Sequence, residues 1–266
     1  MNLSACRLVL RPRPLAEVLD LAVPFFLAGW RPLLRLTAVL FVPVLVLCLT
    51  LRAQGRSALS VWLVAWVAAD VLEGAFTRAA SELLFFEPAQ VRVRALLGRL
   101  VRSAPRALLC WGLTRLCLLG AALVLPALPV VGVRLLFARE SVLLEESGPV
   151  AALGRSHRLV TGHALTATGL LFALLAIPVV TALLAQTLAE GVVGQVLLLP
   201  VPDLFTQGIT TYALVGFLLG VPLQAVARFL AYIDLRTRKE GWDIQLAFAV
   251  LAAREEAGAR PGSEAA

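Results

Sequence analysis

Long apolar stretches separated by short basic segments run through most of the chain. Six of these stretches are predicted to cross a membrane as helices: Leu33–Leu51, Ser57–Ala80, Ala107–Leu125, Val130–Leu144, His163–Leu188 and Leu204–Tyr232. A helix needs about 20 mainly apolar residues to cross the hydrocarbon core of a bilayer. Val130–Leu144 falls short of that length and contains Arg134, Arg139 and Glu140. It is therefore the least typical of the six predicted spans.

Three shorter segments have an amphipathic pattern and are predicted to lie at the membrane surface. They are Leu15–Trp30, Val91–Ser103 and Pro149–Val160, and each comes before a pair of predicted spans. Charged residues fall on one helical face of each segment and apolar residues on the other, which is typical of interfacial helices. We expect all three to lie on the cytoplasmic side.

The distribution of charge decides between the possible topologies. The chain has 24 Lys and Arg residues against 17 Asp and Glu, a net charge of +7. Basic residues concentrate in the cytoplasmic loops of membrane proteins. With six spans both termini are cytoplasmic, and Arg52 and Arg56 are the basic residues left outside. If Val130–Leu144 does not cross, either the segment around Arg155 and Arg158 or the basic tail is placed outside.

Composition excludes a soluble domain. Hydrophobic residues make up 60% of the chain, charged residues 15%, and the mean hydropathy is +0.88, whereas soluble domains are about 25% charged. The near absence of Lys beside abundant Ala, Leu and Val is typical of a GC-rich bacterial genome. We therefore predict an all-α, polytopic transmembrane helical bundle of the bacterial inner membrane. Residues 1–254 would form one transmembrane domain and residues 255–266 a disordered cytoplasmic tail.

Three motifs resemble one bacterial family. The tail Tyr232–Asp243 resembles a Y-x-D-L-R-x-R-x-E-G-x-D ending, Arg13–Asp20 resembles the family's opening, and Glu146–Leu159 resembles its central motif. These integral membrane proteins are similar to the membrane domain of some glycerophosphodiester phosphodiesterases. The resemblance implies a fold and a membrane location but no reaction, because the phosphodiesterase chemistry belongs to a separate barrel that no segment here resembles. Gln245 departs from the family, which usually has an acidic residue there.

Basic residues beside the spans are the candidates for binding lipid or a partner. We expect anionic headgroups to bind the arginines of the second and third amphipathic segments, namely Arg92, Arg99, Arg102, Arg155 and Arg158. Arg236, Arg238 and Lys239 of the tail would bind lipid or a protein partner, since basic clusters next to a span attract anionic lipid. In a helical tail, Asp234 would pair with Arg238 and Arg236 with Glu240. Alternatively, these charges only fix the depth of the last span.

Charged residues inside the predicted spans form the second candidate group: Asp70, Glu73, Arg115, Arg134 and Arg228. Each costs at least a few kcal/mol in a bilayer unless it is paired or hydrated. The simplest interpretation is pairing between helices, for example of Asp70 with Arg115 or Arg134. The alternatives are a polar cavity that binds a lipid headgroup or an ion, and a transport path.

Nothing in the sequence indicates catalysis, a metal site or a cofactor. His157 and His163 are the only histidines, their spacing places them on different helix faces, and Ser156 lies in no G-x-S-x-G turn. Nucleic acid is not an expected partner, because the positive charges lie beside apolar spans. We predict a non-enzymatic scaffold or lipid-interacting module, with a small-solute or lipid transporter as the alternative. The G-x-x-x-G of Gly216 and Gly220 predicts close helix packing inside the chain, or a dimer contact as the alternative.

Overall fold

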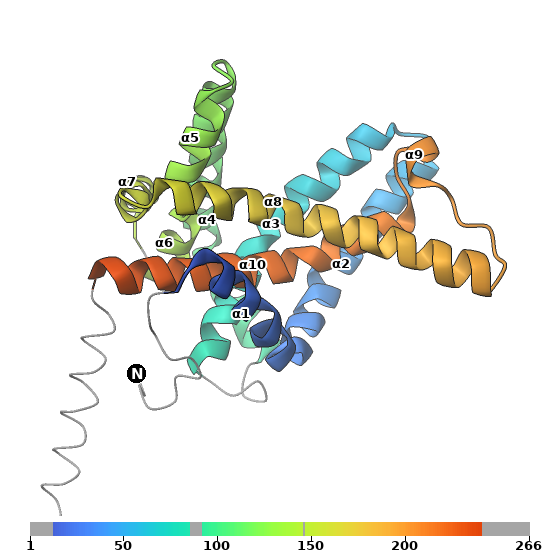
Figure 1. Cartoon of the computed structure of the whole chain (residues 1–266), viewed down its shortest axis with the longest axis horizontal. Helices are drawn as coiled ribbons and strands as arrows, with labels where there is room; N and C mark the ends of the chain where they lie inside the picture. The colour runs from blue at the N-terminus through green and yellow to red at the C-terminus, as the bar shows by residue number, and fades with distance from the viewer. Residues whose placement is uncertain (1–12, 86–91, 146, 241–266) are drawn as a thin grey trace, which may run out of the picture.

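A computed structural model describes residues 13–85, 92–145 and 147–240, and every regular element in these ranges is helical (Figure 1). The α-helices are α1 (Leu15–Ala28), α2 (Trp30–Ala53), α3 (Ala58–Phe85), α4 (Val93–Ala122), α5 (Ala127–Arg134), α6 (Ala138–Glu145), α7 (Pro149–Val160), α8 (Ala164–Ala189), α9 (Leu204–Gln207) and α10 (Thr211–Glu240). A π-helical turn, Glu190–Val196, extends α8. The all-α prediction is confirmed, and the predicted tail 255–266 lies outside the described residues.

Four helices are long and apolar enough to cross a membrane: Trp30–Ala53, Ala58–Leu84, Ala164–Val196 and Thr211–Lys239. They coincide with the first, second, fifth and sixth predicted spans. The shortest has 24 residues, which at 1.5 Å per residue gives about 36 Å, more than the hydrocarbon core of a typical bilayer. These helices indicate a membrane protein.

The other two predicted spans differ from the structure. Ala107–Leu125 is not a helix of its own but part of α4, which continues through Pro105 and takes in most of Val91–Ser103. Val130–Leu144 is divided between α5 and α6, and a helix of eight residues is only about 12 Å long. The prediction of a separate interfacial helix at 91–103 is therefore wrong, and the count of six spans is not confirmed.

The break between α5 and α6 is held by one buried serine. The Ser156 hydroxyl donates to the carbonyl oxygen of Arg134 at 2.8 Å and accepts from the backbone N–H of Phe137 at 3.0 Å. These bonds satisfy backbone groups that the interrupted helix leaves free, so the break costs little even in apolar surroundings. The sequence around the break contains no glycine or proline at 133–137 that would have predicted it.

The last two long helices, α8 and α10, lie side by side, and α10 is the most buried of the four long apolar helices (Figure 1). Gly216 and Gly220 of α10 face α8. A methyl group on Gly216 would lie 2.9 Å from the Cα of Ala182, and one on Gly220 would lie 2.9 Å from the Cα of Pro178. The predicted internal packing of this pair is confirmed, because both glycines are needed for contact within the chain.

Helices α4 and α5 form a hairpin that runs across the direction of α8 and α10 (Figure 1). Its outer surface is apolar: Leu116 is 67% exposed and Leu123 is 89% exposed. Exposed apolar surfaces of this kind are typical of contact with lipid or with a partner. The hairpin packs against α3, α6 and α7 on its other side.

The two ends of the described chain meet. The backbone N–H of Arg13 donates to Asp234 at 2.7 Å, and the Arg238 guanidinium donates to the carbonyl oxygen of Arg13. Helix α1, which covers most of the first predicted amphipathic segment, packs on α10 beside these contacts. The first and last described segments of the chain therefore lie close together.

Candidate functional site

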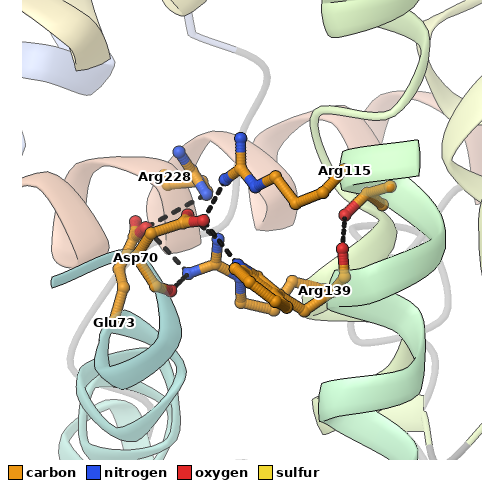
Figure 2. A network of polar contacts seen from close by, with 7 residues as sticks. Asp70, Glu73, Arg115, Arg139 and Arg228 are labelled. Atoms are coloured by element: carbon orange, nitrogen blue, oxygen red, sulfur yellow. Dashed lines mark hydrogen bonds and ion pairs between the residues drawn. The ribbon is translucent and has the colours of Figure 1, made fainter. Parts of the chain in front are cut away.

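A cluster of charged side chains from four helices lies between the packed helices (Figure 2). We call it the polar cluster and define it by five residues: Asp70 and Glu73 of α3, Arg115 of α4, Arg139 of α6 and Arg228 of α10. Asp70 and Glu73 are one helical turn apart, so both carboxylates point to the same side of α3. The short helix α6 brings Arg139 to them from a segment predicted to be part of a span.

Asp70 accepts hydrogen bonds from three donors. Nη2 of Arg139 lies 2.7 Å from Oδ1, the indole N–H of Trp111 donates to Oδ2 at 2.6 Å, and Arg115 also donates to Oδ2. The Arg115 guanidinium lies 5.0 Å from the ring centre of Trp66, within cation–π range. The Asp70 side chain is 10% exposed, so these contacts replace nearly all of its hydration.

Glu73 binds the guanidinium of Arg139, which also donates to Asp70. Nη1 of Arg139 lies 2.8 Å from Oε2 of Glu73 and also 2.8 Å from the backbone oxygen of Asp70, and Nη1 of Arg228 lies 3.3 Å from Oε2 of Glu73. Arg139 therefore joins both carboxylates, and Arg228 ties them to α10. Such a network fixes four helices in one relative arrangement, since each arginine reaches its acid only if its helix is correctly placed.

Glu140 extends the polar cluster but is bonded differently. Its side chain is completely buried, and neither carboxylate oxygen has a hydrogen-bond partner in the described part of the chain. Its charge interacts favourably with those of Arg228 and Arg139 and with its own backbone N–H, and unfavourably with that of Glu73. Counting Glu140, three carboxylates face three guanidiniums. A buried carboxylate without a hydrogen bond is rare in native proteins and calls for an explanation.

The sequence identified most of this site but not all of it. Asp70 pairs with Arg115, one of its two expected partners, whereas Arg134 does not join the cluster and is exposed. Arg139 lies in the fourth predicted span but is not among the predicted site residues, and it is the described arginine that binds both Asp70 and Glu73. Continuous helical spacing would not place Arg134 and Arg139 on one face. The break between α5 and α6 decides which of them faces α3.

Several of the arginines predicted to bind lipid form ion pairs with carboxylates of this chain. Arg99 pairs with Glu82 at 2.8 Å, and Arg155 and Arg236 both pair with Glu145, the latter at 3.3 Å. The Tyr232 hydroxyl also donates to Glu145. Lipid phosphate would have to compete with these internal partners, and headgroup binding by these three residues stays a prediction.

The end of α10 is also occupied by internal contacts. Arg238 pairs with Asp234 at 2.8 Å, as its helical spacing predicts, and the Lys239 ammonium donates to the carbonyl oxygens of Arg158 and Thr161 at the end of α7. A cation there also offsets the negative end of the α7 dipole. The expected partner of Arg236, Glu240, has a side chain outside the described residues. The tail thus holds α1, α7 and α10 together.

Three of the predicted lipid-binding arginines are exposed and available to bind a ligand. Arg92, Arg102 and Arg158 are exposed and have no ion pair within the residues that the structure describes. We call these three the basic surface. Val101 on α4 is 71% exposed and Val150 on α7 is 73% exposed. Each helix therefore offers cationic and apolar groups together, the combination that associates with an anionic bilayer surface.

No group of three or more His, Cys, Asp or Glu side chains among the described residues is placed to hold a metal ion. Comparisons with family models, with curated proteins and with solved structures found no match for this chain. The resemblance of the three motifs to one bacterial family therefore stays a prediction. The described parts of these motifs do meet in space, through Arg13 with Asp234 and through Lys239 with the carbonyl oxygen of Arg158.

Proposed function

We propose that this chain is a non-enzymatic integral protein of the bacterial inner membrane that binds anionic lipid on its cytoplasmic side. The basic surface carries the proposal: Arg92, Arg102 and Arg158 have no acidic partner within the described residues. Arg92 lies just before α4, Arg102 on α4 and Arg158 on α7, and both helices have exposed apolar side chains. A guanidinium can bind a lipid phosphate through two parallel hydrogen bonds. Binding lipid in this way would suit a scaffold that also holds a cytoplasmic or membrane protein partner.

In the topology that accompanies this proposal, four helices cross and both termini are cytoplasmic. The basic residues of α4, α7 and the tail then all lie inside, and Arg52 and Arg56 lie outside. This topology leaves out two predicted spans, Ala107–Leu125 and Val130–Leu144. Removing a pair of spans keeps the number of crossings even, so both termini stay on the cytoplasmic side as they would with six spans. The two topologies differ at the tip of the α4–α5 hairpin, which six spans would place outside.

A cysteine introduced at Leu125 tests this difference in a chain whose native cysteines are replaced by serine. With four spans, a membrane-impermeant maleimide added to intact cells should not label Leu125→Cys, whereas it should label Arg56→Cys in the α2–α3 loop. Labelling of Leu125→Cys from outside would support six spans instead.

The lipid proposal is tested by the selectivity of the protein for spin-labelled phosphatidylglycerol over spin-labelled phosphatidylcholine. Replacing Arg92, Arg102 and Arg158 with Gln should lower this selectivity, and added salt should lower the wild-type value toward that of the variant. Replacing the same three residues with Lys keeps the charge and should retain most of the selectivity. Equal selectivity in the wild type and the Gln variant would contradict the proposal.

Glu140 favours a second candidate function, a transporter with a polar path inside the membrane. A buried carboxylate without a hydrogen bond, beside two guanidiniums, is typical of groups that take up an ion or a proton during transport. Glu140→Gln separates the two functions in vesicles that contain the purified protein. A transporter should lose solute or proton flux while it stays folded, whereas the lipid-binding module should keep its selectivity for phosphatidylglycerol.

A further inference from the structure

An apolar groove of about 400 Å³ lies between α4, α5 and α7 and shares no residue with the polar cluster or the basic surface. It is lined by Cys117 and Ala121 of α4, Ala127, Val131, Arg134 and Leu135 of α5 and its end, and His157 of α7. Its size is within the range of small-molecule sites. Five of the seven lining residues are apolar, and three of those are small, which leaves room for a chain of methylene groups along the α4–α5 hairpin.

Two side chains in the groove can donate hydrogen bonds to an anion. Arg134 and His157 are both exposed, and neither has an ion pair or a side-chain hydrogen bond in the part of the chain described. Ser156 fixes their relative positions, since its hydroxyl binds the backbone of Arg134 and it directly precedes His157. The pair therefore lies on a rigid junction of two helices, a favourable arrangement for a defined binding site.

We propose that this groove binds one anionic phospholipid, with the phosphate at Arg134 and His157 and an acyl chain along Ala121, Ala127 and Val131. The inference rests on the proposed function and adds a second lipid site, separate from the basic surface. Charge complementarity carries it: Arg115 and Arg228 have acidic partners in the polar cluster, whereas Arg134 lies in an apolar groove without one. A phosphodiester would supply the missing negative charge, and its chain would cover the apolar wall.

The surroundings of the groove favour a lipid over a soluble anion. Leu116, Leu123 and Val130 of the same hairpin are exposed apolar side chains, the kind of surface that acyl chains cover. Free phosphate would gain nothing from the apolar wall. A zwitterionic lipid carries its own cation beside the phosphate, so Arg134 should discriminate against it.

Native mass spectrometry of the full chain in detergent, titrated with phosphatidylglycerol or phosphatidylcholine, tests the inference. The wild type should bind one phosphatidylglycerol about tenfold or more tightly than phosphatidylcholine. The double variant Arg134→Gln, His157→Gln should lose that preference, as expected when charge-assisted hydrogen bonds are removed. Ala127→Phe should block the chain side of the groove and weaken both lipids. Thermal unfolding of each variant checks that it is folded.

Arg106→Gln provides the matched control, because Arg106 is an exposed arginine of α4 that does not line the groove. This variant should bind its first phosphatidylglycerol with the wild-type affinity. An unchanged preference in the double variant, or displacement of the lipid by excess inorganic phosphate, would overturn the groove site. The proposed function would still stand if Arg92, Arg102 and Arg158 determine the spin-label selectivity. If the wild type prefers phosphatidylglycerol in neither assay, both fail.

Discussion

The polar cluster and the basic surface use the same residue type for different purposes. Arg139 and Arg228 are 16% and 12% exposed and reach carboxylates on α3. Arg92 and Arg158 are exposed and reach no acid in the described part of the chain. An arginine therefore holds this fold together or faces its environment according to whether a carboxylate is within reach. The sequence shows that an arginine lies beside an apolar segment, but this position does not decide which of these two roles the arginine has.

The largest effect is expected in the polar cluster. Asp70→Asn removes a charge that Arg115 and Arg139 share, and leaves two guanidiniums partly buried without full compensation. Breaking a buried ion pair on one side costs about 3–5 kcal/mol, and we expect a loss of that order in the free energy of unfolding. Denaturation of the purified protein in mixed micelles measures it. Arg92→Gln should change this free energy by less than about 0.5 kcal/mol. Equal midpoints for the two variants would remove the distinction between the regions.

A double-mutant cycle sharpens the same point. Arg115→Gln combined with Asp70→Asn should destabilise the protein by less than the sum of the single changes, with a coupling energy of about 0.5–3 kcal/mol. The reason is that the second change removes a charge that the first has left unpaired. The cycle of Asp70 with Arg134 should show no coupling, because Arg134 lies outside the cluster. Coupling to Arg134 instead would favour the pairing that the structure does not contain.

A smaller effect is expected where α10 meets α6. Tyr232→Phe removes one donor to Glu145, which keeps Arg155 and Arg236 as partners. The expected loss is about 1 kcal/mol, the net value of a typical hydrogen bond. Tyr212→Phe is the matched control, because the Tyr212 hydroxyl has no hydrogen bond within the described residues. A loss as large as that of Asp70→Asn would show that this contact, rather than the polar cluster, dominates the packing.

Much of the fold could be predicted from the sequence, because it depends on local patterns. Apolar length alone locates α2, α3, α8 and α10, and the spacing of Gly216 and Gly220 predicts the contact of α10 with α8. The failures occur where a distant contact decides. The end of α5 depends on Ser156, twenty-two residues after Arg134. Pro105 could have ended a helix but did not, since a proline in a helix can be accommodated by neighbouring packing.

The same reason explains the candidate site. Unpaired acids in an apolar span predicted that Asp70 and Glu73 would find cations, and Arg115 and Arg228 lie among those expected. Which of Arg134 and Arg139 would join them depends on where α5 ends, so it could not be read from spacing. Arg99, Arg155 and Arg236 likewise pair with carboxylates from other helices. Of these pairs, only Glu145 and Arg155 are close in the sequence.

The most direct test compares two triple variants that lose the same net charge. One replaces the basic surface, Arg92, Arg102 and Arg158, with Gln, and the other replaces the internally paired Arg99, Arg236 and Arg238 with Gln. Selectivity for spin-labelled phosphatidylglycerol is measured on both after each is shown to be folded. The first variant should have lower selectivity than the wild type, and the second should retain the wild-type selectivity. Equal losses would show that net charge alone attracts the lipid, and would contradict the assignment of binding to the unpaired arginines.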